Sequence, residues 1–117
     1  MKNTRLMQMP NQWLFKTEVK QSTIHGQGRF ALEDIAIGKN VLKLDGAIVP
    51  KEEAPGKFPV SATHNMNCDD SYVNHSTDAN LAYIGGTSFI SAKNIKAGDE
   101  LTMDYSLIYS KQRELYL

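Results

Sequence analysis

Apolar and polar residues alternate in the first well-patterned stretch of the chain, residues 13–20. One set of alternate positions holds Trp13, Phe15, Thr17 and Val19, and the other holds Leu14, Lys16, Glu18 and Lys20. Because a period of two places successive side chains on opposite faces of an extended backbone, this stretch is predicted to be a strand with one buried face. Short apolar runs at 30–32 and 41–44 predict two further strands.

A second pattern repeats along the chain. Two segments share apolar residues spaced around a glycine, Ile35-x-x-Gly38-x-x-Val41 and Ile95-x-x-Gly98-x-x-Leu101. Ala31 precedes the first unit as Ser91 precedes the second. In each unit we expect a strand to enter a glycine turn and leave as another strand. Two related hairpins favour an all-β core of short strands over a helical bundle.

Other stretches carry weaker patterns. Residues 46–70 contain Pro50, Pro55, Gly56 and Pro59, which are expected to interrupt any regular element, and residues 63–70 form a polar run typical of a loop. Residues 1–12 are expected to form a loosely held arm. Residues 107–117 are compatible with a short helix or an extended flap, and the pattern does not decide between them.

Composition narrows the class of protein. The length of 117 residues suits one domain, and its 13 basic and 13 acidic residues cancel, so no direct nucleic-acid binding is expected. Cys68 is the only cysteine, which excludes an intrachain disulfide, and its spacing from His64 and the nearby aspartates fits no standard metal site. No run is long and apolar enough for a membrane span, and the first residues lack the apolar core of a signal peptide. We therefore expect an intracellular protein without membrane contact.

The candidate chemistry lies in three separated segments. The first is Gly26-x-Gly28, where the backbone can approach a ligand closely or simply form a tight turn. It does not match a dinucleotide fingerprint, since the third glycine and the following helix are missing. The second is the polar stretch 71–80, with Asn74-His75-Ser76 and then Asn80, which in isolation is typical of a compact turn. The third, 99–105, is predicted to be a strand that ends on Asp104 and Tyr105.

In this order and at these spacings, the three segments resemble the SET-domain family of protein lysine methyltransferases. The motifs that carry the resemblance are Gly26-x-Gly28, Asn74-His75-Ser76 with Asn80, and Glu100-Leu101-Thr102-x-Asp104-Tyr105. The resemblance implies a mainly β fold of the β-clip type, with several small sheets of short strands, a C-terminal pseudoknot and little helix. It places the SET domain at 13–106, between the N-terminal arm 1–12 and a C-terminal tail or flap at 107–117. The variable insert of the family would fall within 46–70 and would form only a minimal wall of the substrate groove.

The resemblance also implies a cofactor and roles for individual residues. The cofactor would be S-adenosyl-L-methionine, converted to S-adenosyl-L-homocysteine. The cofactor-binding residues would be His25, Gly26, Gln27, Gly28, Arg29, Asn74, His75 and Tyr105. Of these, residues 25–29 would contribute backbone, Asn74 would bind the amino or carboxylate end of the cofactor, and His75 would meet the adenine through its backbone. Tyr105 would be the catalytic tyrosine, and Tyr83 and Tyr109 are candidates for the lysine channel. Glu100 and Asp104 would organise backbone groups, and Asn80 would be structural.

The chain also departs from the family pattern. Thr77 and Ala79 replace a usual cysteine and proline, and no tyrosine occurs between Ala31 and Ser71, where many members supply one. Without a zinc motif after the domain, the lid over the lysine would come from 107–117 or from a second subunit. The sequence therefore predicts a protein-lysine N-methyltransferase that acts on a protein or peptide substrate. A homodimer is also reasonable, because a sizeable pocket is hard to build in so short a chain. The alternatives are a catalytically inactive SET-like module that binds a protein or peptide, and a β-hairpin domain that shares only the fold.

Overall fold

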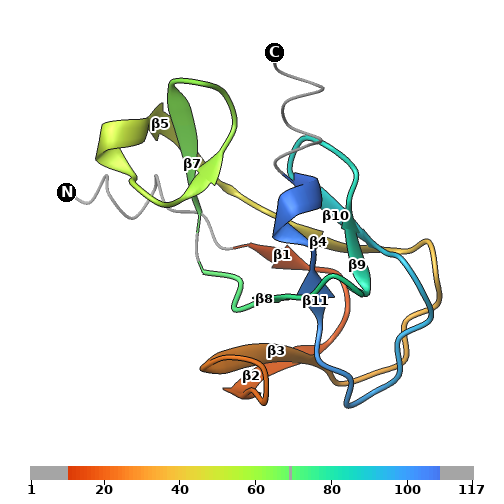
Figure 1. The fold of residues 1–117 in the computed structure, drawn as a ribbon. Helices are drawn as coiled ribbons and strands as arrows, with labels where there is room; N and C mark the ends of the chain where they lie inside the picture. Colours follow the sequence, from red (N-terminus) through yellow and green to blue (C-terminus); the bar gives the residue numbers. More distant parts are fainter. Residues whose placement is uncertain (1–10, 69, 109–117) are drawn as a thin grey trace.

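The computed structural model describes residues 11–68 and 70–108, and most of their regular structure consists of short strands (Figure 1). In chain order the elements are β1 (Gln12–Trp13), β2 (Thr17–Gln21), β3 (Gln27–Ala31), β4 (Asn40–Lys43), β5 (Gly46–Pro50), the 3-10 helix η1 (Lys51–Glu53), β6 (Phe58–Pro59), β7 (His64–Cys68), β8 (Asn74–His75), β9 (Leu81–Tyr83), β10 (Ser88–Ser91) and β11 (Thr102–Met103). A helical turn follows at 105–108. The predicted mainly β fold of several small sheets is confirmed.

The central sheet has the strand order β1-β4-β10-β9-β11-β8. Its neighbours are antiparallel except around β11, which runs parallel to both β8 and β9. The chain therefore leaves β9, forms β10 and the second glycine unit, and returns to insert β11 between two strands that precede it in sequence. This insertion is the arrangement that the predicted C-terminal pseudoknot requires. A two-stranded β2-β3 hairpin and a three-stranded sheet of order β5-β7-β6 flank the central sheet (Figure 1).

The two glycine units pair with each other, which the repeat in the sequence did not reveal. Ile35 and Ile95 form an antiparallel bridge, with each backbone N–H donating to the other residue's carbonyl at 2.8 Å. The ends match as well: the N–H of Gly38 donates to the Ser91 carbonyl at 2.8 Å, and the N–H of Gly98 donates to the Ala31 carbonyl at 2.7 Å. Both glycines have positive φ, +84° and +97°, as the predicted turns require. The repeat thus builds a local two-fold arrangement that closes one end of the core.

The prediction of one continuous strand at 13–20 is wrong. The structure breaks it into β1 and β2, because the N–H of Leu14 donates to the Val41 carbonyl at 2.9 Å and the chain bends before β2. Alternation of burial persists as far as Thr17, but Val19 is 38% exposed, since the β2-β3 hairpin projects from the central sheet. The alternating pattern therefore marks two strands in two different sheets.

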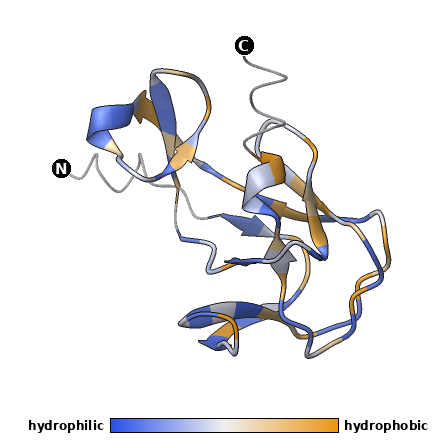
Figure 2. Cartoon of the chain, in the orientation of Figure 1, coloured by the Kyte–Doolittle hydropathy of each residue, from blue (hydrophilic) through white to orange (hydrophobic). Residues whose placement is uncertain are grey.

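The expectation that the prolines prevent regular structure in 46–70 is also wrong. They lie where a missing N–H does little harm: Pro50 ends β5 and precedes η1, and Pro59 lies in β6, an edge strand of two residues. Figure 2 shows hydrophilic residues over η1, the short coil at the upper left, in agreement with the charged run Lys51-Glu52-Glu53. The segment forms a small sheet of its own rather than an irregular insert.

The polar run predicted as a loop at 63–70 instead contains β7, the central strand of that small sheet. Asn65 is 4% exposed, and its amide is satisfied from outside the strand. Its Nδ2 donates to the Ala54 carbonyl at 2.8 Å, and its Oδ1 accepts from Lys51 Nζ at 2.9 Å. A buried polar residue with these partners is compatible with a central strand, and its neighbour Met66 packs into the core.

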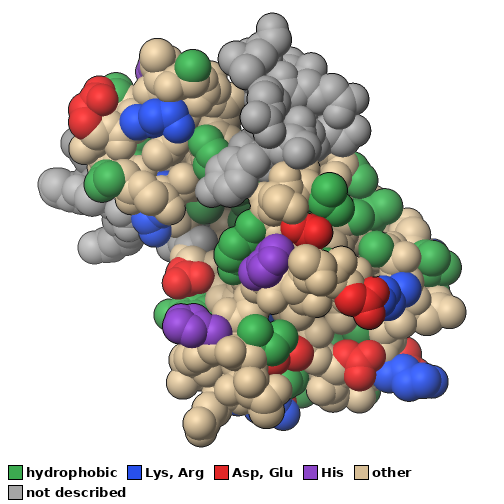
Figure 3. Space-filling model, in the orientation of Figure 1, with side chains coloured by type: hydrophobic (Ala, Val, Ile, Leu, Met, Phe, Trp, Pro, Cys, Tyr) green, Lys and Arg blue, Asp and Glu red, His purple; other side chains and the backbone are tan. Residues whose placement is uncertain are grey.

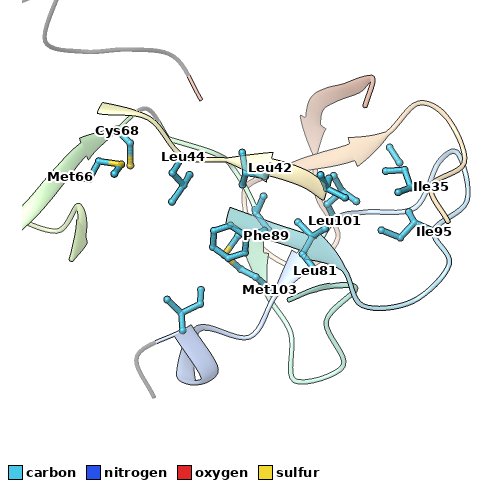
Figure 4. Close-up of a cluster of buried hydrophobic side chains, with 14 residues drawn as sticks. Ile35, Leu42, Leu44, Met66, Cys68, Leu81, Phe89, Ile95, Leu101 and Met103 are labelled. Atoms are coloured by element: carbon cyan, nitrogen blue, oxygen red, sulfur yellow. The ribbon is translucent and has the colours of Figure 1, made fainter. Parts of the chain in front are cut away.

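One hydrophobic core connects these sheets. Figure 4 shows Ile35 and Ile95 at one end of it, Phe89 and Met103 in the middle and Met66 near the other end. Phe89 is fully buried, and the rings of Phe58 and Tyr83 pack against it with centroid distances of 6.4 and 5.2 Å. The small sheet is therefore joined to the central sheet through aromatic contacts as well as through the chain.

The surface is electrostatically mixed. Figure 3 shows acidic and basic side chains scattered over the visible face, without a broad patch of one sign. Across 11–68 and 70–108, no helix has the length and apolar character needed to cross a membrane. Residues 1–10 of the predicted arm 1–12 and residues 109–117 of the predicted tail 107–117 lie outside the described residues. Gln12 already belongs to β1, and residues 107–108 lie in the helical turn. The proposed domain boundaries stay predictions.

Candidate functional site

The three sequence motifs meet around the parallel pair formed by β8 and β11. Thr102 lies opposite Asn74 and Met103 lies opposite His75. The pairing of the two segments continues just after β8, because the N–H of Ser76 donates to the Met103 carbonyl at 3.1 Å. Tyr105 then follows β11 directly, so two segments far apart in sequence are held in a fixed register at one place.

Asn74 connects this pair to the glycine loop. Its Nδ2 lies 3.0 Å from the His25 carbonyl, 3.2 Å from the Gln27 carbonyl and 2.9 Å from Glu100 Oε2. Ser22 Oγ, at 3.2 Å, is a fourth neighbour of the same nitrogen. Because an amide nitrogen carries two hydrogens and these neighbours are acceptors, the NH₂ group must point inward. The Oδ1 atom accepts no hydrogen bond from the described residues, so it can accept one from another donor.

His75 and Tyr105 interact through the backbone and through their rings. The Tyr105 N–H donates to His75 Nδ1 at 3.1 Å, and the ring centroids are 5.1 Å apart. Asp104 Oδ1 lies 4.0 Å from the same Nδ1. The Ser106 hydroxyl donates to Asp104 Oδ1 at 2.6 Å, and this bond is the main reason that the pKa of Asp104 is lowered. Asp104 therefore organises the turn after β11, as expected.

The Tyr105 hydroxyl donates to the Val73 carbonyl at 2.6 Å. This bond fixes the position of the phenolic oxygen, an atom that by its chemistry can accept a hydrogen bond as well as donate one. Tyr105 also lines a cavity of about 380 Å³ between the small sheet and the end of β11. A hydroxyl oxygen fixed at the wall of a cavity is suited to orienting an N–H donor within it.

The cavity is mostly apolar with a polar rim. It is lined by Leu44, Pro55, Gly56, Lys57, Phe58, Pro59, Cys68, Asp70, Ser71, Val73, Phe89, Met103, Tyr105 and Ile108. Lys57 Nζ donates to the Cys68 carbonyl at 3.1 Å, which holds one positive charge in the wall. Half of these lining residues, from Pro55 to Asp70, belong to the insert that was expected to form a minimal wall. Its aromatic residue is Phe58, which lacks a hydroxyl.

The two glycines of the loop differ in role. Gly26 has φ +46°, and a Cβ there would meet no atom within 4 Å, so the backbone is open to a ligand. Gly28 is buried in β3, and a Cβ there would meet the Glu100 carboxylate and would lie 3.0 Å from Ser22 Cβ. The space beside Gly28 is therefore filled by the protein itself. The Ser22 N–H donates to the Gly26 carbonyl at 2.8 Å and closes the turn.

Arg29 is anchored within the fold. Its Nε donates to the Ser71 carbonyl at 3.1 Å, and its guanidinium carbon lies 4.6 Å from the centroid of the Trp13 ring. Its own carbonyl accepts from the Leu101 N–H at 2.8 Å. Burial lowers the pKa of the Arg29 guanidinium. The side chain thus joins the β2-β3 hairpin to the segment before Asn74.

The structure describes only one of the two candidate channel tyrosines, Tyr83. The Tyr83 hydroxyl donates to the Gly86 carbonyl at 2.7 Å, and its ring packs on Phe58 and Phe89, which line the cavity. Tyr83 itself is not among the lining residues. Tyr109 lies outside the described residues. Both assignments stay predictions.

Sequence reasoning missed two residues at this site. Ser22 Oγ lies 2.8 Å from both carboxylate oxygens of Glu100, behind Asn74. Tyr72 is 42% exposed with φ +59°, an uncommon conformation for a residue with a side chain, and it lies between the cavity residues Ser71 and Val73. A lone serine in a turn gives no signal of a distant partner, and nothing in the sequence indicates a positive φ at a tyrosine.

Asn80 has the structural role that was expected of it. Its Nδ2 donates to the Glu100 carbonyl at 2.9 Å, and its Oδ1 accepts from the Thr102 N–H at 2.8 Å. These two bonds hold the start of β11 against the segment that leads into β9. Within 11–68 and 70–108, no group of three or more His, Cys, Asp or Glu side chains is arranged to hold a metal ion.

Comparison with solved structures gives the same architecture. A humanized mutant of the Polycomb Repressive Complex 2 from Chaetomium thermophilum, bound to an inhibitor, matches with a TM-score of 0.65 and 25% identity over 78% of this chain. KRYPTONITE in complex with DNA, an H3(1-15) peptide and SAH matches with a TM-score of 0.65 and 21% identity over 80% of this chain. The matches span 15% and 24% of those longer chains. No curated protein matches the sequence.

A family model provides the assignment. The model of the SET domain matches residues 26–106, which begin at the glycine loop and end just after Tyr105. The matched range covers well over half of the 117 residues and contains all three motifs that meet around β8 and β11. The chain belongs to the SET-domain family.

Proposed function

We propose that this protein is an S-adenosylmethionine-dependent protein-lysine N-methyltransferase. The observation that carries the proposal is the pairing of β8 with β11, because it joins two different surfaces. On one side Asn74 faces the open backbone of the glycine loop, and on the other Tyr105 lines an apolar cavity. A methyl donor on the first surface and an amine in the second would meet at this strand pair.

The residues present fit the cofactor. Asn74 presents an oxygen, an acceptor that suits the α-ammonium of a methionine moiety better than its carboxylate. The resemblance left both ends of the cofactor open, and the inward NH₂ group favours the ammonium. Gly26 leaves its backbone uncovered, so a ligand can approach closely. The bound cofactor would supply a methyl group already activated by its sulfonium.

The chain's own task is then to prepare and orient the amine. An ammonium has no free lone pair, so the lysine must lose a proton before it can attack. The apolar lining, which includes Phe58, Phe89 and Met103, disfavours a charged amine by desolvation. The charged groups of Lys57 and Asp70, which also line the cavity, act on the amine in opposite directions. The Tyr105 oxygen can accept an amine N–H and so direct the nitrogen lone pair away from itself. The proton would leave to solvent, since the mechanism needs no strong side-chain base.

Calorimetric titration with S-adenosylmethionine tests the cofactor assignment. Wild type should bind in the micromolar range, about −8 kcal/mol, and Asn74→Ala should lose most of the affinity. Asn40→Ala, in the exposed start of β4, is a matched control that should bind as wild type does. A folded wild-type protein that shows no binding would contradict the proposal.

Methyl transfer is then tested with labelled cofactor and a peptide library containing lysine. Tyr105→Phe should keep cofactor affinity and lose most of the labelling, because it lacks the oxygen that orients the amine. Tyr83→Phe should keep most of the labelling if its hydroxyl serves only the bond to the Gly86 carbonyl. Equal labelling by wild type and Tyr105→Phe would refute the catalytic role of Tyr105.

The second candidate function is a non-catalytic module that binds a protein or peptide. The specific observation in its favour is Phe58, which contributes a ring but no hydroxyl to the cavity wall. Such a module would bind a peptide in the cavity without depending on Asn74. Peptide binding that survives Asn74→Ala, with no cofactor binding by wild type, would favour it. A homodimer is a separate proposal that light scattering on the purified chain would test.

A further inference from the structure

Ser22 and Glu100 form a charged support behind Asn74. They are 78 residues apart in sequence, yet the Ser22 Oγ lies 2.8 Å from each Glu100 carboxylate oxygen. Glu100 Oε2 also lies 2.9 Å from Asn74 Nδ2. The same Ser22 oxygen accepts from the N–H groups of Ile24 at 2.8 Å and His25 at 3.3 Å. One hydroxyl thus connects the glycine loop to the segment that leads into β11.

The proton count fixes the direction of these bonds. Because Ser22 Oγ accepts from backbone N–H groups, its own single proton is free to go to the Glu100 carboxylate, which can only accept. The carboxylate then also requires a donor from Asn74, so the amide must present NH₂ to it. A flipped amide would place Oδ1 against the carboxylate and against the carbonyls of His25 and Gln27. The carboxylate and the two carbonyls therefore favour the same one of the two amide orientations.

Strand β3 packs closely against Ser22 and Glu100 at Gly28. A Cβ at Gly28 would lie 2.9 Å from the carboxylate carbon of Glu100 and 3.0 Å from Ser22 Cβ. The backbone of β3 therefore covers the Ser22–Glu100 pair directly, and the glycine leaves room for the pair rather than for a ligand. Both side chains are half-buried, whereas a Cβ at Gly26 would meet no atom within 4 Å.

We propose that Ser22 and Glu100 are positioning residues that hold the Asn74 amide with its oxygen toward the cofactor, and so determine the affinity for the α-ammonium group. The inference rests on the proposed function. It differs from the expectation that Glu100 organises only backbone groups, because here Glu100 acts on the side chain of Asn74. Neither Ser22 nor Glu100 is among the residues that line the cavity at Tyr105.

The test compares two ligands, S-adenosylhomocysteine and an analogue that lacks its α-amino group, by calorimetry. Wild type should bind the analogue roughly tenfold more weakly, in keeping with the loss of one charge-assisted hydrogen bond. Ser22→Ala and Glu100→Gln should bind S-adenosylhomocysteine roughly tenfold more weakly than wild type and bind the analogue about as well as wild type does. The discrimination between the ligands should thus largely disappear.

Two control variants separate positioning from general loosening of the fold. Ser61→Ala removes a hydroxyl that accepts from the N–H groups of Thr63 and His64 in a similar turn but contacts no carboxylate. Glu33→Gln neutralises a carboxylate that accepts from the Lys16 N–H. Both should discriminate between the two ligands as wild type does, and urea midpoints should be measured for every variant.

The outcomes are distinct. Equal weakening of both ligands by Ser22→Ala and Glu100→Gln would show a merely structural role and overturn the inference, as would unchanged affinity for S-adenosylhomocysteine. If wild type binds neither ligand, the proposed cofactor fails and this inference fails with it. If wild type binds S-adenosylhomocysteine and the variants keep full discrimination, only the inference is refuted.

Discussion

Replacing Gly28 by alanine is the perturbation that tests the packing of the site most directly. The added Cβ would lie 2.9 Å from the Glu100 carboxylate carbon and 3.0 Å from Ser22 Cβ, well inside normal contact distances. Because φ at Gly28 is not positive, alanine suffers no backbone strain there, and the effect comes from crowding alone. Overpacking of this kind destabilises a protein by about 1–3 kcal/mol.

The decisive comparison is between the cost of Gly28→Ala in wild type and its cost in a Glu100→Ala variant. Glu100→Ala removes the nearest obstacle, so adding Gly28→Ala to that variant should cost at least about 1 kcal/mol less than adding it to wild type. The entropy of the unfolded chain favours alanine over glycine by about 0.4–1 kcal/mol, and the substitution in the Glu100→Ala background could then approach neutrality.

Gly26→Ala is the matched control. Gly26 has open space around it but a φ of +46°, so alanine there should cost about 1–2 kcal/mol through backbone strain, whether or not Glu100 is present. Urea denaturation of wild type, the three single variants and the two double variants at one pH supplies the free energies of unfolding. If Gly28→Ala costs the same in both backgrounds, or nothing in wild type, the packing described around Ser22 and Glu100 is wrong.

Three further changes have defined outcomes. Asn80→Ala should lower the free energy of unfolding by about 2–4 kcal/mol in urea, since it leaves the Glu100 carbonyl and the Thr102 N–H without their partners, and a loss below about 0.5 kcal/mol would contradict this role. Phe89→Ala, at a fully buried position, should cost about 3–5 kcal/mol, and a midpoint close to wild type would argue against the central place of this ring. Because the pKa of Asp104 is lowered below 3.8, its carboxylate stabilises the fold above that pH, and the contribution is lost as the pH falls through the folded pKa. The stability difference between wild type and Asp104→Asn should therefore be largest near about pH 7 and fade toward about pH 3, whereas a difference independent of pH would refute the linkage.

The sequence predicted the parts of the fold that local pattern encodes. Gly38 and Gly98 adopt the positive φ that their predicted turns require. The strands are short, as predicted, and the three motifs meet at one site. The pairing of Ile35 with Ile95 was not predictable, because similarity between two units says nothing about whether they bond to each other.

Two of the misses, at Asn65 and Ser22, share one physical cause, which is a partner outside the local segment. Asn65 looked like a loop residue because the groups that satisfy its buried amide, Lys51 Nζ and the Ala54 carbonyl, lie in the preceding helical segment. Ser22 looked like an ordinary turn residue because its carboxylate partner, Glu100, belongs to the other end of the domain. Polar residues have ready local interpretations, so their long-range bonds stay hidden until the chain is folded.

The insertion of β11 between β8 and β9 has a consequence for the order of folding. Parallel neighbours distant in sequence form slowly, since much chain must be ordered before the contact is gained. The β2-β3 and β6-β7 hairpins can form from neighbouring residues, but β11 enters a gap whose two sides must already be in place. Tyr105 and Glu100 would then reach Asn74 only in the last step. A partly folded intermediate with native hairpins would lack the proposed cofactor site, so binding of S-adenosylmethionine in a refolding experiment should report completion of the whole fold rather than early collapse.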